Sequence, residues 1–329
     1  MKRVTIYEVA NEANVSLATV SRVINGSEVV RLETRQRVEE AISKLGYKPN
    51  AIAQGLALQK TTTIALVIPE ASFTYTGQII NGLLDVAKIY KYNIMLHTIT
   101  EGIADMNDVV EDIIKSRVDG VIIYNDKLIN HDFSNVTRYN VPIAIIGDRI
   151  SDKHICSVYV NIKKAVYELV TQYLEKGFTD IAIIQDRKNM YSVDQMILGA
   201  KLAFEKKGLE FTNYIEIPAE YRNSYAYMKE YFHKKQPQLV IANRDSQALA
   251  CINAAKECNV NVPEDMEVVC VIDTKYNAMV RPQISSFAIP SYDLGAVAMR
   301  LMTKMLQEEE VEEKEIELSY LFTPRQSTN

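Results

Sequence analysis

Beyond residue 61 the chain repeats one pattern of hydrophobic positions: a short β-branched apolar run, then a longer segment whose apolar positions lie three and four residues apart. The unalternating runs are typical of strands buried on both faces of a parallel sheet, and the periodic segments are typical of the helices that connect such strands. The pattern predicts strands at 63–68, 94–98, 120–124, 143–146, 157–160, 181–185, 239–242 and 268–272, and helices at 76–90, 106–116, 163–176, 195–207, 225–232 and 246–257.

This series of strands and helices is too long for one sheet and falls into two runs with a break near Asn161. Gly177, Gly208 and Asn259 follow three of the helices, at positions where a left-handed residue ends a helix. We therefore predict an α/β core of two doubly wound parallel-sheet subdomains. Ligands of open parallel sheets bind beyond the carboxyl ends of the strands, so a cleft is expected where the two sheets face one another.

The first sixty residues follow a different pattern, in which three short segments have helical spacing. Asn14 and Val15 break the first helix, and Ser16 stands as an N-cap before the second. A third helix is expected over 33–45 and ends at Gly46. This is helix-turn-helix spacing around one small core, with predicted members Ile6, Val9, Ala10, Ala13, Val20, Val23, Ile24, Val38, Ala41, Ile42 and Leu45.

The second of these helices has the side chains that a DNA recognition helix needs. Short side chains at its start let it approach base edges, and Arg22, further along, can donate a forked pair of hydrogen bonds to guanine. Arg22 could instead be a solvated surface residue, but the turn pattern favours DNA. Lys2, Arg3, Tyr7 and Lys48 are expected to contact phosphates, which position the protein. The outward positions are Leu17, Ala18, Thr19, Ser21, Arg22 and Asn25.

Charge divides the 329-residue chain in the same place. The net charge is −5, yet residues 1–60 hold nine Lys or Arg and six Glu, a net charge of +3, which leaves −8 on the remainder. A cationic segment on an acidic body is typical of a protein whose first domain binds a polyanion. Hydrophobic residues make up 47% of the chain and charged residues 24%, which is the composition of a globular protein.

Several classes of function are excluded by what the sequence lacks. No apolar run reaches the length of a membrane span, and Glu8 and Glu12 interrupt any signal peptide, so we expect a cytoplasmic protein. The four cysteines form no Cys-x-x-Cys pair, which favours reduced thiols over disulfides or a metal site. No P-loop or Gly-x-Gly-x-x-Gly is present, and the four histidines make no catalytic constellation, so neither enzyme activity nor a cofactor is expected.

Residues 49–57 form a short helical segment between the two parts of the chain. It is too short to be a stable helix in water alone, so it must fold against something. Ile52 and Leu56 are apolar, four residues apart and outside any expected core. Two chains could pair here over DNA, with Leu56 inserted as a wedge into a base step of the minor groove.

The amino-terminal motifs resemble those of the LacI family of bacterial transcription regulators. They are Thr5-Ile6-Tyr7-Glu8-Val9-Ala10, Val15-Ser16-x-Ala18-Thr19-Val20-Ser21-Arg22-Val23-x-Asn25 and Gly46-Tyr47-x-Pro49-Asn50-x-x-Ala53. The resemblance implies a homodimer on operator DNA and adds Thr5, Ser16, Tyr47, Asn50 and Ala53 to the DNA-contacting residues. It also implies a headpiece at 1–48, a hinge helix at 49–61, and a core like a periplasmic binding protein, with one subdomain at 62–160 and 292–322 and the other at 161–291 and 323–329.

Motifs near the carboxyl end are similar to those of the family members that govern carbon catabolite control, notably Met279-Val280-Arg281-Pro282-Gln283 and the segment from Tyr292 to Lys304. This similarity implies a pseudo-palindromic operator and a protein corepressor, the phosphocarrier HPr phosphorylated on serine. On a helix, Asp293, Val297, Arg300 and Lys304 would form one outward stripe, and the two bases, one turn apart, could hold a phosphoserine. The expected corepressor surface comprises Tyr292, Asp293, Val297, Arg300, Leu301 and Lys304.

The alternative regulator is a small sugar or sugar phosphate in the cleft, with Ser72, Tyr75, Arg149, Asp245 and Asp273 as its binding residues. The arginine that sugar-responsive family members carry three residues before a glycine is replaced here by Met196, before Gly199, which argues against a sugar. Gln54 and Leu58 also depart from the family pattern, which affects the hinge contacts to phosphate.

Overall fold

The computed structural model describes residues 4–27, 29–48, 61–69, 73–99, 109, 111–124, 140–186, 191–217 and 220–329. The chain divides into two compact units, residues 1–62 and 63–329. The α/β class, with an amino-terminal helix-turn-helix domain and two sheets that are mostly parallel, is confirmed. None of the described helices is both long enough and apolar enough to cross a membrane.

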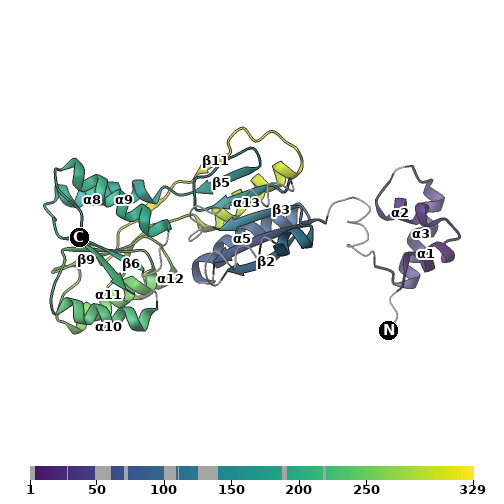
Figure 1. Ribbon diagram of the computed structural model, residues 1–329. Coiled ribbons are helices and arrows are strands. Elements are labelled where there is room, and N and C mark those ends of the chain that lie inside the picture. The colour runs from purple at the N-terminus through teal and green to yellow at the C-terminus, as the bar shows by residue number, and fades with distance from the viewer. Residues whose placement is uncertain are drawn as a thin grey trace. The chain divides into compact units, whose positions relative to one another are not determined.

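The first unit contains α1 (Ile6–Glu12), α2 (Leu17–Ile24) and α3 (Leu32–Leu45), labelled in Figure 1. Ser16 caps α2, because its hydroxyl oxygen accepts a hydrogen bond from the backbone N–H of Thr19 at 3.2 Å. Gly46 ends α3 in the left-handed conformation, with φ of +63°. The predicted apolar positions of all three helices meet in one core around the fully buried Val9, Val20 and Val38.

The second unit holds two six-stranded sheets within its described residues. The first sheet is parallel throughout, in the order β11-β5-β4-β3-β1-β2, and the second, in the order β12-β10-β9-β8-β6-β7, is parallel except for β12. The strands of the first sheet are β1 (Thr63–Pro69), β2 (Asn93–Ile99), β3 (Gly120–Tyr124), β4 (Ile143–Ile146), β5 (Ile155–Tyr159) and β11 (Glu315–Glu317). Those of the second are β6 (Ile181–Asp186), β7 (Tyr214–Ile217), β8 (Leu239–Ala242), β9 (Glu267–Cys270), β10 (Ser285–Ala288) and β12 (Leu321–Thr323).

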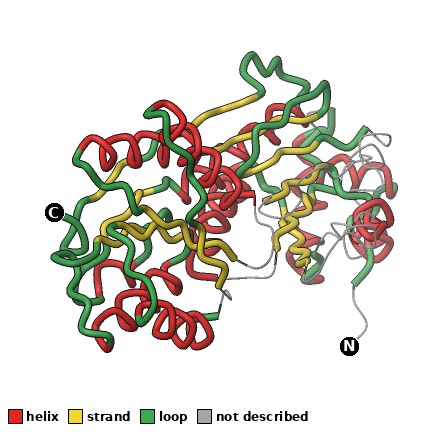
Figure 2. Tube along the Cα trace, turned by 60° about the vertical axis from the view of Figure 1, so that its left-hand side comes forward, coloured by secondary structure: helices red, strands yellow, loops and turns green. Residues whose placement is uncertain are grey.

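Helices cover these sheets, as the red and yellow elements of Figure 2 show. On the first sheet, α5 (Phe73–Ile89) and α13 (Ser291–Leu306) pack over Ile64, Leu66 and Ile122. The other face buries Val67 and Val121 beneath residues 111–116, which are helical. On the second sheet, α8 (Ile162–Glu175) and α9 (Tyr191–Lys206) cover one face, and α10 (Tyr221–Phe232) and α11 (Asp245–Glu257) cover the other (Figure 1). A short helix, α12 (Lys275–Met279), follows β9.

Most predicted elements are confirmed, and the differences lie at the ends of elements and in four short strands. Strand β5 begins at Ile155 and β9 ends at Cys270, earlier than predicted, and α9 begins four residues early, at Tyr191. Strands β7, β10, β11 and β12 were not predicted. Because β12 pairs with β10, residues 321 and 322 belong to the second sheet, so the predicted subdomain boundary after residue 322 lies too late. Of the predicted helix 106–116, the structure describes residue 109 and residues 111–116.

Candidate nucleic-acid interface and regulatory surfaces

The recognition helix α2 presents the side chains that the sequence predicts. Leu17, Ala18, Arg22 and Asn25 are exposed, and Thr19 and Ser21 are half-buried, while Val20 and Val23 face the headpiece core. Arg22 makes no ion pair with another described residue. The helix therefore has an uncovered polar face with a long, free guanidinium near its end.

The remaining predicted DNA contacts divide into free and engaged side chains. Tyr7 is 64% exposed. Thr5, by contrast, donates hydrogen bonds from its backbone N–H and its hydroxyl to the Glu8 carboxylate, at 2.7 and 2.9 Å, and its position is set by this capping contact. Ser16 caps α2, and Tyr47 packs against the headpiece core. Asn50, Ala53 and Leu56 lie outside the described residues.

On α13 the expected stripe faces solvent for most of its length. Asp293, Arg300 and Lys304 are exposed, and none of them forms an ion pair with another described residue. Val297 is half-buried. Leu301 is only 4% exposed, so the prediction that it contributes to the outer surface is wrong. The stripe thus offers two unpaired cations one helical turn apart beside a half-buried valine.

Helix α13 crosses α5 in direct backbone contact. A Cβ atom on Gly295 would lie 1.9 Å from the Ile79 carbonyl oxygen, and one on Gly82 would lie 1.9 Å from the Tyr292 carbonyl oxygen. Both glycines are required because any side chain would force the helices apart. Across the same contact the Tyr292 hydroxyl donates a hydrogen bond of 2.8 Å to Asp85 of α5, which raises the pKa of Tyr292. The surface of α13 is therefore fixed relative to α5.

A cavity of about 260 Å³ is lined by residues of both sheets of the core. Arg149 follows β4, and Asn161 and Lys163 lie at the start of α8. Arg149 pairs with Glu315 at 2.6 Å, and the Ser151 hydroxyl and this guanidinium lower the pKa of Glu315. Burial and a hydrogen bond to Asp148 raise the pKa of Tyr191, which also lines the cavity.

Asn243 is one of the lining residues of this cavity that the sequence did not predict. It follows β8 and is only 2% exposed. Its amide nitrogen donates to the Ser192 hydroxyl at 3.1 Å, but its buried Oδ1 has no hydrogen-bond partner among the described residues. An unsatisfied buried acceptor costs free energy, so a donor from a bound molecule would be favoured here. The signal was available in the sequence as a polar residue directly after an apolar strand.

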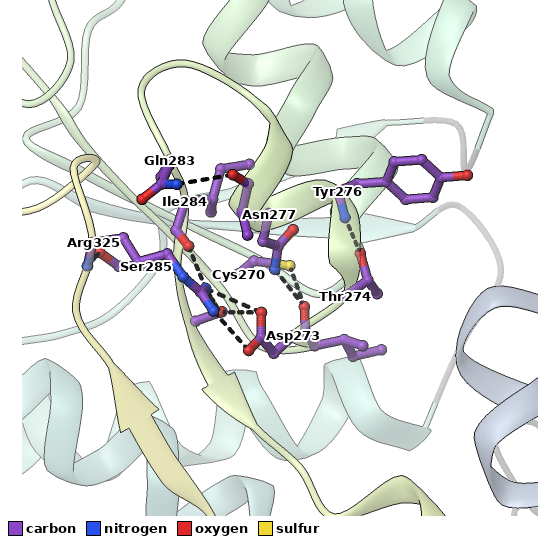
Figure 3. A network of polar contacts seen from close by, with 12 residues as sticks. Cys270, Asp273, Thr274, Tyr276, Asn277, Gln283, Ile284, Ser285 and Arg325 are labelled. Atoms are coloured by element: carbon purple, nitrogen blue, oxygen red, sulfur yellow. Dashed lines mark hydrogen bonds and ion pairs between the residues drawn. The ribbon is translucent and has the colours of Figure 1, made fainter.

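The two aspartates predicted for the cleft do not line the cavity, which corrects that prediction. Asp245 accepts hydrogen bonds from the Thr274 hydroxyl and the Ser246 backbone N–H, both at 2.7 Å. Asp273 forms a two-pronged ion pair with Arg325, with Nη1 to Oδ1 at 3.0 Å and Nη2 to Oδ2 at 2.8 Å (Figure 3). Ser72 and the side chain of Tyr75 lie outside the described residues. Of the five predicted cleft residues, Arg149 is the one found in the lining.

Comparison with known proteins agrees with the headpiece and core. The model of the lacI family of bacterial regulatory proteins matches residues 5–50, and that of the periplasmic binding protein-like domain matches residues 170–328. The chain is 34% identical over 328 residues to catabolite control protein A of Staphylococcus epidermidis and 33% identical to that of Staphylococcus aureus, and each match covers 99% of both chains.

Solved structures give the same picture. The transcription regulator CcpA of Lactococcus lactis is 26% identical, with a TM-score of 0.72, and the match covers 81% of this chain and 99% of that one. The lac repressor dimer bound to operator and the anti-inducer ONPF is 22% identical, with a TM-score of 0.87 over 99% of both chains. At that identity the second likeness shows the fold alone.

Proposed function

The chain belongs to the LacI family of DNA-binding transcription regulators, and on this premise we propose that it binds pseudo-palindromic operators as a homodimer, more tightly when serine-phosphorylated HPr is bound to α13. Like these relatives, it is a transcription regulator and not an enzyme. In this proposal α2 reads base edges through Ala18, Thr19 and Arg22, Tyr7 contacts phosphate, and Leu56 inserts into the minor groove.

One observation carries the corepressor proposal: Arg300 and Lys304 are exposed, one turn apart, and unpaired among the described residues. Two cations left free at this spacing fit a phosphoserine, whose charge of nearly −2 and three acceptor oxygens favour charge-assisted hydrogen bonds. Asp293 is free to pair with a basic residue of the partner, and Val297 with the Tyr292 ring offers apolar contact beside it. The similarity to catabolite control protein A supports the same partner.

The test is fluorescence anisotropy of a labelled palindromic operator titrated with the protein alone, with HPr, and with serine-phosphorylated HPr. We expect phosphorylated HPr, but not unphosphorylated HPr, to raise the affinity of the protein for the operator. The double variant Arg300→Ala, Lys304→Ala should lose this gain and keep its basal affinity. The matched control Lys207→Ala, Lys234→Ala removes the same charge from the second sheet's side of the core and should respond normally. A response of the α13 variant equal to that of the native protein would refute the proposed surface.

The homodimer proposal rests on exposed apolar side chains that a monomer would leave in water. Leu84, Ile89 and Tyr90 lie on or directly after α5, and Met95 and Leu96 lie on the edge strand β2. A second group on the other subdomain comprises Tyr221 of α10 and Tyr276 and Met279 of α12. Large exposed apolar patches mark association surfaces, and a twofold dimer matches a palindromic operator.

A second candidate function, regulation by a small molecule, is favoured by the Oδ1 of Asn243 in the wall of the cavity, which has no partner in the part of the chain that the structure describes. Arg149, Lys163 and Gln195 supply further donors around it. Isothermal titration with sugars and sugar phosphates tests this function. If a sugar or sugar phosphate gives heat of binding and the Asn243→Leu variant does not, an effector in the cleft is supported. If none of these compounds binds, HPr remains the proposed regulator.

A further inference from the structure

Helix α9 carries an apolar stripe that no function described above uses. Leu198 and Leu202, one turn apart, are 45% and 44% exposed, on the side of α9 opposite to its buried Met196, Ala200 and Phe204. The next large apolar residues along the chain that are exposed are Leu209, just beyond the helix, and Tyr214 on β7 at the edge of the second sheet. A leucine pair at this spacing is typical of a helix that packs against another helix.

The charges that flank the leucines identify the partner. Asp194, Leu198, Leu202 and Lys206 follow one another at intervals of four residues, so they form a single ridge along α9. From the amino end the ridge has the order acid, leucine, leucine, base, and from the carboxyl end it has the order base, leucine, leucine, acid. Two copies of α9 laid antiparallel about a twofold axis near residue 200 therefore place leucine against leucine in the middle and an acid against a base at each end. The sequence of the ridge is complementary to itself.

We propose that α9 is a second homotypic interface, through which two dimers associate into a tetramer. Asp194 has no ion-pair partner among the described residues, so its carboxylate is available to a second chain. The Lys206 ammonium is held at the helix end by the Tyr167 hydroxyl, at 3.1 Å, and its side chain is exposed. Asp194 is half-buried and Lys206 is exposed, so both charges of the ridge reach the surface.

This interface is separate from the surfaces proposed for the DNA-binding dimer. On the second sheet, α8 and α9 cover one face and α10 and α11 cover the other (Figure 1). Tyr221, at the start of α10, and α9 are thus on opposite faces of the sheet. A chain can use both interfaces at once, and two different twofold contacts per chain make a dimer of dimers with four headpieces.

Sedimentation equilibrium of the full-length protein tests the proposal. The native protein should reach tetramer mass at micromolar concentration, and Leu198→Glu, Leu202→Glu should shift the mass to a dimer, with the tetramer dissociation constant raised about 100-fold or more, because four leucines lose their buried contacts. Both leucines are exposed, so their replacement leaves the core intact. Unchanged far-UV circular dichroism and unchanged affinity for a single operator verify this.

A charge exchange tests the antiparallel register. Asp194→Lys alone places lysine against lysine at both ends of the interface, and Lys206→Asp alone places aspartate against aspartate, so each should weaken the tetramer. The double variant Asp194→Lys, Lys206→Asp restores opposite charges and should recover the native mass. The loss of the Lys206 contact to Tyr167 cannot explain that recovery, because the double variant also lacks it.

Variants at the two interfaces separate this inference from the proposed dimer. Met279→Glu should disrupt the DNA-binding dimer and leave α9 pairing intact, whereas the α9 leucine variant should leave a dimer that binds one operator normally. A native protein that remains a dimer at high concentration, or an α9 leucine variant with unchanged mass, overturns the tetramer proposal. Either result leaves the proposed dimer standing.

Discussion

Replacing Arg325 with methionine should destabilise the core and leave cavity binding unaffected. The Arg325 guanidinium joins the end of the chain to β9 and β10 (Figure 3): it pairs with both carboxylate oxygens of Asp273 and donates to the Ile284 carbonyl at 2.8 Å and to the Ser286 hydroxyl. The side chains of Arg325 and Asp273 are 16% and 21% exposed. Methionine keeps the apolar length of the arginine and removes all of these donors.

The size of the destabilisation follows from the hydrogen bonds that Asp273 retains in the variant. Without the guanidinium, its remaining side-chain donor among the described residues is the Ser286 hydroxyl at 2.9 Å. Breaking a buried pair by removing one partner costs about 3 to 5 kcal/mol, and partial exposure reduces this to about 2 to 4 kcal/mol. For a core of this size, each kcal/mol lowers the melting temperature by about 2 °C. We therefore expect Tm to fall by about 4 to 8 °C.

Far-UV circular dichroism during heating measures the change in Tm, and during urea unfolding it measures the change in free energy, since the chain has no tryptophan to follow by fluorescence. The double variant Asp273→Asn, Arg325→Met should cost less than the sum of the two single variants, since it leaves no charge unpaired. Lys229→Met is the matched control: it breaks a more exposed pair with Glu257, at 2.7 Å, and should cost below about 1 kcal/mol. If Arg325→Met leaves stability unchanged and instead alters binding in the cavity, Asp273 belongs to the cleft as the sequence suggested.

Three further predictions concern separate parts of the chain. Arg22→Ala should weaken operator binding by about 1 to 3 kcal/mol per half-site, and a plot of log affinity against log salt for the native protein should have a slope of about −5 or steeper; salt-independent binding would exclude a phosphate interface. Gly295→Ala should lower the free energy of urea unfolding by at least about 3 kcal/mol, because α13 must move off α5. The control Gly77→Ala, whose added methyl group meets open space, should be neutral or slightly stabilising. Equal effects of the two variants would refute the crossing. Burial raises the pKa of Cys270 to about 12, so this thiol stays protonated until the pH approaches that value, and Ellman's reagent at pH 8 should label the half-buried Cys258 first; rapid labelling of all four thiols would contradict the burial.

The strands predicted from the sequence are those whose stability comes from their own apolar residues. β1, β3 and β4 are continuous runs of β-branched and other apolar residues, which fit only a position with helices on both faces. The missed strands β7 and β11, Tyr-Ile-Glu-Ile and Glu-Ile-Glu, lie at sheet edges and are short and half polar. Their extended form depends on a neighbouring strand that is distant in sequence, which local patterns do not reveal.

The error at Leu301 has a similar cause. Spacing places Leu301 next to the outward stripe of α13, and on a helix with one buried side it would face solvent. But α13 packs against α5 and also against β3, β4 and β5, so its buried arc is wider than one side. Spacing identifies which residues share a helix side, whereas the width of the buried arc depends on how many elements surround the helix.

The aspartates illustrate the same limit at a candidate site. Asp273 follows β9, where parallel sheets place ligand-binding residues, so the cleft prediction was reasonable. Its actual partner is Arg325, fifty-two residues away. The nearby Ser327 holds this segment in place, because its carbonyl accepts a hydrogen bond from the Val268 N–H and its N–H donates one to the Gln283 carbonyl. Asn243, by contrast, stands in the sequence as a polar residue directly after an apolar strand, and the structure adds its unsatisfied Oδ1.

The α5–α13 crossing connects two of the proposed surfaces directly. The corepressor stripe is on the outside of α13, and the apolar dimer residue Leu84 is on α5, two residues beyond the glycine that touches α13. Because Gly82 and Gly295 bring the two backbones into contact, α13 cannot shift alone. If HPr binds the arrangement of α5 that the DNA-bound dimer uses, linkage requires that DNA strengthen HPr binding by the same factor that HPr strengthens DNA binding. A corepressor acting through α5 needs no small molecule in the cavity, so the two modes of regulation can coexist in one chain.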